Sequence, residues 1–291
     1  MEFRELQYYL AVVEEGTISG AAEALHVAQP SLSRQMRELE EKLGKTLFLR
    51  GNRKITLTEE GMILRKRASE MLQLMEKTEQ EIAGTDKEIS GDIYIGAAET
   101  DAVHYITKAA SSLRKTHAKI HFHIASGDTT DTLFQLDQGL IDFALLFYLD
   151  DQEKYNGIQL PVSDNWGVLM KNSHPLATKP SVSFRRDLIT EPLIMSRLVR
   201  GKLFPGIDTD DLNIVATYSL AYNASLMVED GLGIAVCFDS IVNVNSKHNN
   251  DLVFVPLDDF NFDIHPTLIW KKYQVLSRTS KAFIEELQNL I

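Results

Sequence analysis

The chain has 291 residues, 44% of them hydrophobic, and 30 basic against 41 acidic side chains give a net charge of −11. This length allows about two domains with substantial cores. No apolar run reaches the roughly 18 residues of a membrane-spanning helix, and the charged start MEFRELQYYL does not match a secretory signal peptide. The single cysteine, Cys237, excludes an intrachain disulfide and favours a reducing, cytoplasmic compartment.

Residues 18–43 predict two short helices joined by a tight turn at His26–Ala28. Pro30 suits the first turn of the second helix, because the N–H that proline lacks would be unpaired there anyway. Small and apolar residues recur at helical spacing in both helices, so we expect them to face inward. They are Ile18, Ala21, Ala22 and Leu25 in the first helix and Leu32, Met36, Leu39 and Leu43 in the second.

The opposite face of the second helix carries side chains that can hydrogen-bond to base edges and phosphates. In helix-turn-helix proteins, the N-terminal residues of the second helix contact bases in the major groove of DNA. A surface helical hairpin in an all-α core has the same spacing and stays open as an alternative at this point. The expected DNA-binding residues are Gln29, Pro30, Ser31, Ser33, Arg34 and Arg37.

Positive charge is concentrated around this helix pair. Residues 28–67 carry ten basic and five acidic side chains, a net charge of +5, whereas residues 91–291 have a net charge of −8. Contact with phosphate depends on local charge, so the acidic total does not argue against DNA binding. The acidic remainder of the chain would repel DNA and so limits DNA binding to one surface.

A short hairpin is predicted next, with strands at Thr46–Leu49 and Lys54–Leu57 around the turn signal Gly51-Asn52. Beside a DNA-binding helix, such a hairpin acts as a wing that contacts the DNA backbone. An ordinary solvated hairpin is the alternative. The expected wing contacts are Arg50, Arg53 and Lys54.

A long helix is predicted from the N-cap Thr58 to about Ala83, with Glu59 and Glu60 in its first turn, where the helix dipole favours acidic groups. Apolar residues recur along it at alternating spacings of four and three, which predicts a dimer seam. Packing against its own domain is the alternative. The seam comprises Leu64, Ala68, Met71, Met75, Thr78 and Ile82.

Residues 1–83 together resemble the N-terminal region of the LysR-type transcriptional regulators. The resemblance rests on FRELQYYLAVVEEGTISGAAEALHVAQPSLSRQMRELEEKLGKTLFLR, on the hairpin GNRKITLT and on Thr58-Glu59-Glu60-Gly61. It implies a double-stranded DNA operator as partner. A homodimer follows also from the seam, whereas a homotetramer is implied by the resemblance alone.

The rest of the chain resembles the same family more weakly, in GDIYIGAAE (91–99), LFQLDQGLIDFALLF (133–147), VLMKNSHPLA (168–177) and MVEDGLGIAVCF (227–238). In this region the regulators are similar to periplasmic binding proteins, with two α/β subdomains around a small-molecule cleft. The resemblance implies a transcriptional regulator controlled by an effector, without catalytic activity, metal or cofactor.

The residues themselves agree with an α/β architecture. Short apolar strands at Asp92–Gly96, Ile120–Ala125 and Asp142–Phe147 alternate with helical stretches at 103–116 and 131–139, the rhythm of a parallel sheet. A second group of strands is predicted at Gly167–Lys171, Leu193–Ser196 and Gly233–Phe238. Strands at Leu252–Leu257 and Thr267–Lys271, followed by a helix at 278–290, could return to the first sheet.

These patterns predict three domains or segments. A winged helix-turn-helix domain spans residues 1–58, and a linker helix with its hinge spans 59–90, where the polar stretch 84–91 marks a boundary. An effector-binding domain spans 91–291. Its first subdomain covers about 91–161 and 266–291, and its second about 162–265.

Candidate effector contacts follow from the rule that open α/β sheets bind ligands beyond the carboxyl ends of their strands. Hydroxyl and acidic residues in these loops have an equally good purely structural role as helix caps. The candidates are Ala98, Glu99, Thr100 and Asp101 after the first strand; Ser126, Gly127, Asp128 and Thr129 after the second; and Ser196, Arg197, Arg200, Tyr218 and Phe238 in the second subdomain.

The acidic residues Glu99, Asp101 and Asp128 depart from the neutral hydroxyls that such loops more often carry in the family. We therefore expect an effector with a cationic or hydroxyl-rich part, and Arg197 or Arg200 to contact an anionic end.

Two other functions are open to these residues. His117, His121 and His123 suggest a metal-dependent enzyme, because His121 and His123 share one face of a strand at a spacing that can hold zinc. A solute-binding protein would use the cleft alone, but it would not need the helix pair at 18–43. The glycines Gly231 and Gly233 precede a strand, so they do not indicate a dinucleotide-binding turn.

Overall fold

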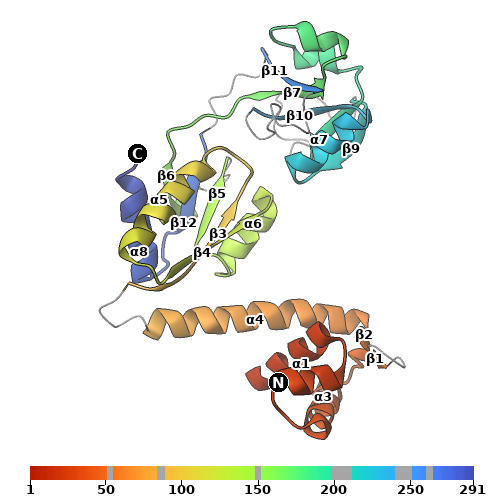
Figure 1. Cartoon of the computed structure of the whole chain (residues 1–291), viewed down its shortest axis with the longest axis vertical. Helices are drawn as coiled ribbons and strands as arrows, with labels where there is room; N and C mark the ends of the chain where they lie inside the picture. Colours follow the sequence, from red (N-terminus) through yellow and green to blue (C-terminus); the bar gives the residue numbers. More distant parts are fainter. Residues whose placement is uncertain (51–54, 84–88, 148–151, 198–211, 240–250, 260–264) are drawn as a thin grey trace. The chain divides into compact units, whose positions relative to one another are not determined.

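The computed structural model describes residues 1–50, 55–83, 89–147, 152–197, 212–239, 251–259 and 265–291. The chain divides into two compact units, Met1–Thr85 and Asp86–Ile291 (Figure 1). Each unit has its own core and is described separately.

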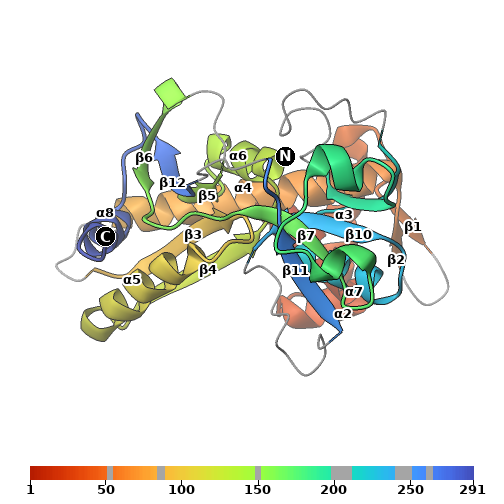
Figure 2. The same ribbon diagram turned by 90° about the horizontal axis from the view of Figure 1, so that it is seen from above.

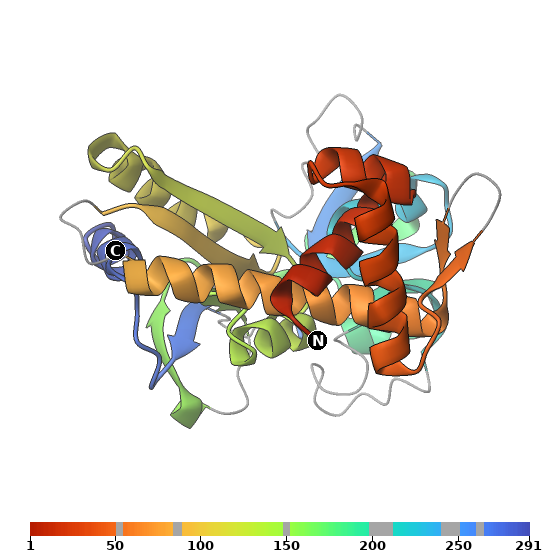
Figure 3. The ribbon, with the colours of Figure 1, turned by 90° about the horizontal axis from the view of Figure 1, so that it is seen from below.

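The first unit places three short helices and a two-stranded hairpin beside the beginning of one long helix (Figure 3). Residues from all six elements or their adjoining turns form one apolar core, in which Tyr9, Leu32, Met36 and Ala68 are fully buried. The elements are α1 (Phe3–Glu15), α2 (Ile18–Ala24), α3 (Gln29–Leu43), β1 (Phe48–Arg50), β2 (Ile55–Leu57) and α4 (Glu59–Ala83).

The predicted helix pair is present, with one correction. Leu32, Met36 and Leu39 of α3 are buried as expected, but Leu43 is 41% exposed. The reason is that α3 ends there: Gly44 follows in the left-handed conformation at φ 64°, which turns the chain away from the core.

The predicted seam of α4 is divided between two environments. Leu64 and Ala68 pack into the core of the first unit, so the alternative of packing within the domain is correct for these two residues. Met71 and Ile82 are 40% and 70% exposed. Thr58 begins the helix as predicted, its Oγ1 accepting a hydrogen bond from the Gly61 N–H at 3.0 Å.

The second unit contains two five-stranded sheets. The first sheet has the order β4-β3-β5-β12-β6; β3 is parallel to β4 and β5, whereas β12 is antiparallel to both of its neighbours. It is therefore mixed and not purely parallel. Its strands are β3 (Gly91–Ala97), β4 (Ile120–Ser126), β5 (Phe143–Leu146), β6 (Tyr155–Gln159) and β12 (Thr267–Lys271).

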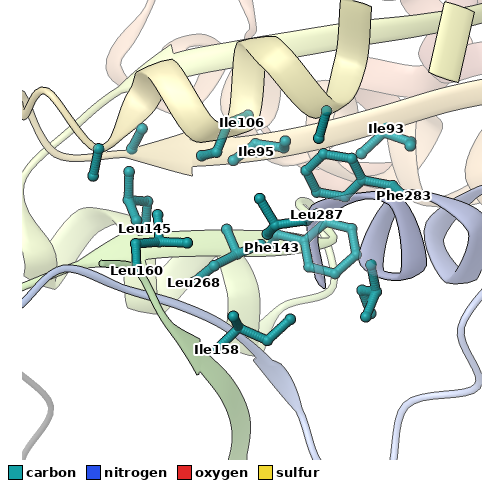
Figure 4. Packing of buried hydrophobic residues seen from close by; sticks show 14 of the residues in the cluster. Ile93, Ile95, Ile106, Phe143, Leu145, Ile158, Leu160, Leu268, Phe283 and Leu287 are labelled. Atoms are coloured by element: carbon teal, nitrogen blue, oxygen red, sulfur yellow. The ribbon is translucent and has the colours of Figure 1, made fainter. Parts of the chain in front are cut away.

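Helices cover both faces of the first sheet (Figure 1). On one face, Phe283 and Leu287 of α8 pack with Ile106 of α5 against Phe143 and Leu145 (Figure 4). Leu136 of α6 packs on the other face. These helices are α5 (Val103–Thr116), α6 (Thr129–Asp137) and α8 (Arg278–Gln288), and a 3₁₀ turn at Gln152–Lys154 precedes β6.

The second sheet has the order β11-β7-β10-β8-β9, with β8 parallel to β9 and β10, and β7 antiparallel to β10 and β11. Helix α7 (Ala221–Glu229) packs on one face, and a π-helical turn (Phe184–Leu188) packs on the other, near a 3₁₀ turn at Pro175–Thr178. The strands are β7 (Trp166–Lys171), β8 (Leu193–Ser196), β9 (Ile214–Tyr218), β10 (Ile234–Phe238) and β11 (Leu252–Pro256).

The strand at 252–256 belongs to this second sheet, whereas β12 and α8 return to the first. Residues 160–165 cross from β6 to β7 and connect the two sheets (Figure 2).

Candidate DNA-binding surface and effector site

Local structure defines both ends of α2. Thr17 Oγ1 accepts from the Gly20 N–H at 3.0 Å and thereby caps α2, and His26 turns the chain with a left-handed φ of 54°. The small side chains of Ala21 and Ala22 are buried in the same core as Leu32, which lets α2 and α3 approach closely. This is the arrangement predicted for residues 18–43.

The opposite face of α3 is open. Gln29, Pro30 and Ser31 in its first turn are exposed, and so are Arg34 and Arg37 one and two turns later. Ser33 is half-buried. Arg34 Nε donates to Glu38 Oε1 at 2.8 Å, and 81% of the Arg34 side chain is accessible. The guanidinium is thus held along the helix with its other N–H groups available.

Partly buried polar contacts fix α3 within the first unit. Lys42 near its end pairs with Glu5 of α1, and this hydrogen bond holds the pKa of the Glu5 carboxyl below its usual value. Glu40 Oε1 accepts from the backbone N–H groups of Leu47, at 2.7 Å, and Phe48. The hairpin is therefore tied directly to α3. Of the predicted wing contacts, Arg50 ends β1, and Arg53 and Lys54 lie outside the described residues.

Helix α4 joins the same unit through two close contacts. The Tyr9 hydroxyl donates to the Gly61 carbonyl at 2.6 Å in a buried position, and burial raises the pKa of Tyr9 to about 12. A Cβ atom at Gly61 would lie 2.3 Å from the Leu47 carbonyl oxygen. Only glycine allows α4 to start this close to the backbone before β1.

In the second unit, the loop after β3 connects the two sheets. Glu99 Oε2 accepts from the Ala221 N–H of α7 at 2.5 Å, and Thr100 Oγ1 donates to Asp164 Oδ2 at 2.7 Å. Ala98, Glu99 and Thr100 are half-buried, and Asp101 is exposed. We call the region formed by the Glu99–Ala221, Thr100–Asp164 and Phe147–Phe238 contacts the junction.

Aromatic rings also pack against one another at the junction. Phe238 at the end of β10 lies 4.4 Å from the Phe147 ring of the first sheet and 4.1 Å from the Trp166 ring, measured between ring centroids. Tyr218 is buried in the second sheet, where its hydroxyl donates to the Val236 carbonyl at 2.8 Å. Burial raises its pKa well above the usual value.

Asp164 is a junction residue that the sequence did not indicate. It is 1% exposed, and its pKa is raised to about 6, mainly by burial; the hydrogen bond from the Thr100 hydroxyl acts in the opposite direction, and the charges of Asp239 and Asp101 act in the same direction as burial. Asp239 in turn accepts from the backbone and side-chain N–H groups of Asn165. Asp164 precedes a strand, whereas the rule applied to the sequence considers only residues that follow strands.

The other candidate residues are less closely connected to the junction. Asp128 caps α6, with Oδ1 accepting from the Asp131 N–H at 2.9 Å, which is the structural role weighed above. Ser126 is exposed, and Gly127 and Thr129 are half-buried. Ser196 is half-buried, Arg197 is exposed, and Arg200 lies outside the described residues.

The histidines of β4 have an acidic neighbour. Asp92 Oδ1 lies 2.8 Å from His123 Nε2 and 3.7 Å from His121 Nδ1. Within the described ranges, however, no three His, Cys, Asp or Glu side chains are arranged to hold a metal ion. No helix in these ranges is both long enough and apolar enough to span a membrane.

Two family models match this chain. One, described as the bacterial regulatory helix-turn-helix protein of the lysR family, covers residues 3–62, and the LysR substrate binding domain covers residues 86–290. The chain belongs to the LysR family of bacterial transcriptional regulators. The family and the fold class predicted from the sequence are confirmed: this LysR-family chain has the family's DNA-binding helix-turn-helix and its effector-binding domain.

Among its relatives, the HTH-type transcriptional regulator BsdA of Bacillus subtilis is 26% identical over 98% of this chain and 99% of its own length. The hydrogen peroxide-inducible genes activator of Pectobacterium carotovorum is 30% identical over 67% of this chain and 64% of its own length. The matched part therefore spans less than two thirds of that activator.

Solved structures share the whole fold. HinK, a LysR family transcriptional regulator from Pseudomonas aeruginosa, has a TM-score of 0.57 and 25% identity, covering 99% of this chain and 98% of HinK. Full-length CbnR in a complex with its target DNA has a TM-score of 0.70 at 18% identity and covers all of both chains.

Proposed function

We propose that this LysR-family chain binds a two-fold DNA operator through α3 and the adjoining hairpin, and that a small molecule bound at the junction regulates it. The observation that carries the DNA-binding half is the exposed face of α3, where Ser31, Arg34 and Arg37 project from the most basic part of the chain. We propose no catalytic role. The three segments proposed are residues 1–58 for DNA binding, 59–90 for dimerisation and 91–291 for effector binding.

A second copy of this chain is the partner proposed for α4. Beyond the core of the first unit, α4 exposes Ile63, Met71, Leu74 and Ile82 at 59%, 40%, 44% and 70%. These residues lie within about one third of the helix circumference, as expected for a stripe that packs on another helix. A dimer also matches the two half-sites of a typical helix-turn-helix operator. The tetramer stays a prediction from family resemblance.

Operator binding tests this proposal. An operator is first selected from random DNA by repeated binding and amplification, and its affinity is then measured by gel shift. We expect Arg34→Ala to weaken binding by about 1–3 kcal/mol if the guanidinium contacts a base. The control Lys115→Ala removes the same charge from α5 in the second unit and should leave the affinity nearly unchanged. Equal affinities of wild type and Arg34→Ala would remove Arg34 from the DNA-binding residues.

Size-exclusion chromatography, together with the gel shift, tests the dimer. We expect Leu74→Glu to lower the apparent size in chromatography and to reduce binding to two half-sites more than to one, because it places a charge in the apolar stripe. Ser69→Glu, an exposed change on the same helix outside this stripe, is the matched control. A Leu74→Glu protein of unchanged size would contradict the α4 interface.

We propose that the effector carries an amino or hydroxyl group. The junction contains the half-buried carboxylate of Glu99, with the exposed Asp101 nearby, and the rings of Phe147 and Phe238 can contact a cation through their faces. Arg197 is available for an anionic end. Titration of the full-length protein with amines, polyols and carboxylates should detect binding of the first two classes; binding of simple carboxylates alone would contradict this assignment.

A response to peroxide through cysteine is not expected here, although one relative is named a hydrogen peroxide-inducible genes activator. Peroxide oxidises exposed thiolates. Cys237 is the only cysteine of the chain; it is 2% exposed, and burial raises its pKa to about 12. Operator affinity should therefore be the same before and after hydrogen peroxide treatment, and a change reversed by thiol reductant would contradict this inference.

A further inference from the structure

The N-terminus of α7 is capped by a residue from the other sheet. The N-cap residue is Leu220, in an extended conformation (φ −124°, ψ 130°), and its hydrocarbon side chain cannot accept a hydrogen bond. Glu99 Oε2 accepts from the Ala221 N–H instead, at 2.5 Å and across 122 residues of sequence. A carboxylate in this position pairs with the positive end of the helix dipole.

The position of Glu99 matches that of a bound anion. The first N–H groups of a helix have no partner within the helix, and free carboxylates and phosphates bind to them for that reason. Glu99 is half-buried, and its charge raises the pKa of Tyr218 and Cys237, so the carboxylate lies close to the end of the second sheet. The anionic group at the N-terminus of α7 is thus the Glu99 side chain, a part of the chain itself.

We propose that Glu99 is a specificity-determining residue that occupies the N-terminus of α7 as a built-in anion and so excludes an anionic group of an effector from this helix end. This inference rests on the proposed role of the second unit as an effector domain. An effector with a cationic or neutral contact group can approach the Glu99 carboxylate, whereas a carboxylate would have to displace it. The nearby acidic side chains of Asp101 and Asp164 add to the repulsion of an incoming anion.

Acetate is the probe, because it presents the same group as Glu99. Full-length wild type, Glu99→Ala and Asp101→Ala are melted at equal ionic strength in sodium acetate and in sodium chloride. We expect acetate at about 0.1 M to raise the melting temperature of the second unit of Glu99→Ala by about 3 °C relative to chloride, because it fills the vacated cap. Wild type and Asp101→Ala should show no such rise; Asp101→Ala removes the same charge from the neighbouring residue without uncapping α7.

A double variant locates the effect. Glu99→Ala with Leu220→Asp supplies a carboxylate from the N-cap position of α7 itself, where Asp is a favoured cap, and should abolish the response to acetate. If Glu99→Ala does not fold, Glu99→Gln replaces it, since its amide oxygen can still accept from Ala221 while the charge is lost. For Glu99→Gln, acetate should raise the melting temperature less than for Glu99→Ala but more than for wild type.

The proposal is overturned if acetate stabilises wild type as much as the Glu99 variants, or if the double variant keeps the response. Operator binding is measured on the same proteins and should be retained by all of them, because Glu99 lies outside the DNA-binding unit. Absence of operator binding by wild type would contradict the proposed function and leave the acetate comparison unaffected.

Discussion

The two units each bury an acidic side chain, and they surround it in opposite ways. Glu5 in the first unit is 9% exposed and pairs with Lys42, which lowers its pKa. Asp164 in the second unit is 1% exposed; burial raises its pKa to about 6, and the negative charges of Asp239 and Asp101 act in the same direction.

This difference bears on what each unit has to do. The Glu5–Lys42 pair joins α1 to the end of α3 and holds α3, the helix proposed to contact DNA, in one position. Asp164 lies where residues 160–165 cross between the two sheets, and its charge is unfavourable in the contact seen here. A ligand that binds one arrangement of the sheets better than another shifts their populations, and a small energy gap makes that shift easier.

The largest expected effect is that of Asp164→Asn. Because the folded pKa of about 6 lies above the ordinary aspartate pKa of 3.8, the folded unit binds this proton more tightly than the unfolded chain does. The carboxylate therefore destabilises the second unit above about pH 6 and ceases to do so as the pH falls towards 4. We expect Asp164→Asn to stabilise this unit at pH 8 by about 2–3 kcal/mol and to remove that part of its pH dependence.

Urea unfolding between pH 4 and 8 measures this effect. The control Glu285→Gln neutralises an exposed carboxylate on α8 and should leave the stability nearly unchanged at every pH. The contrast between the two units would fail if Asp164→Asn destabilised the second unit at pH 8.

Glu5→Gln should act in the opposite direction and in the other unit. The pKa of Glu5 is lowered by its hydrogen bond with Lys42, so its contribution is present above the unfolded pKa near 4.5 and is lost as the pH falls below it. We expect the amide to destabilise the first unit by about 2 kcal/mol at pH 7, the loss of one charge-assisted hydrogen bond.

Amide hydrogen exchange of peptides from α1 and α3 would localise that loss. Glu14→Gln, an exposed change on the same helix, is the matched control. A protein with unchanged exchange in α3 would show that the Glu5–Lys42 pair does not hold this helix.

The sequence predicted the first unit more completely than the second, for a physical reason. The contacts that position α3 come from neighbours within about 50 residues, and helical spacing, the turn at His26 and the cap Thr58 are local signals. Strands β6 and β9, which were not predicted, each lie at one edge of a sheet and contain a single buried residue, Ile158 and Tyr218 respectively, so burial leaves little apolar pattern in them. The edge position alone does not decide the outcome, because the edge strands β4 and β11 were predicted.

The junction was predicted only in part for a related reason. Glu99 and Thr100 follow a strand and were found by that rule, but their partners Ala221 and Asp164 are 122 and 64 residues away. Nothing in the local sequence pairs these residues. The exposure of Leu43 was missed because the helical spacing of apolar residues continues to the last turn of α3. The helix ends at Leu43, and Gly44 follows as its C-cap.

The smallest expected effects come from two buried tyrosines that provide a like-for-like comparison of the units. Tyr9 donates to the Gly61 carbonyl at 2.6 Å in the first unit, and Tyr218 donates to the Val236 carbonyl at 2.8 Å in the second. Each replacement by phenylalanine removes one neutral hydrogen bond and keeps the ring, so each should cost about 1 kcal/mol. Tyr9→Phe should increase hydrogen exchange only in α1–α4, and Tyr218→Phe only in β8–β10 and α7. Increased hydrogen exchange that spread from either site into the other unit would show that the two units unfold together. In that case the opposite pH responses of Glu5 and Asp164 would both act on one unfolding transition and could not be assigned to separate units.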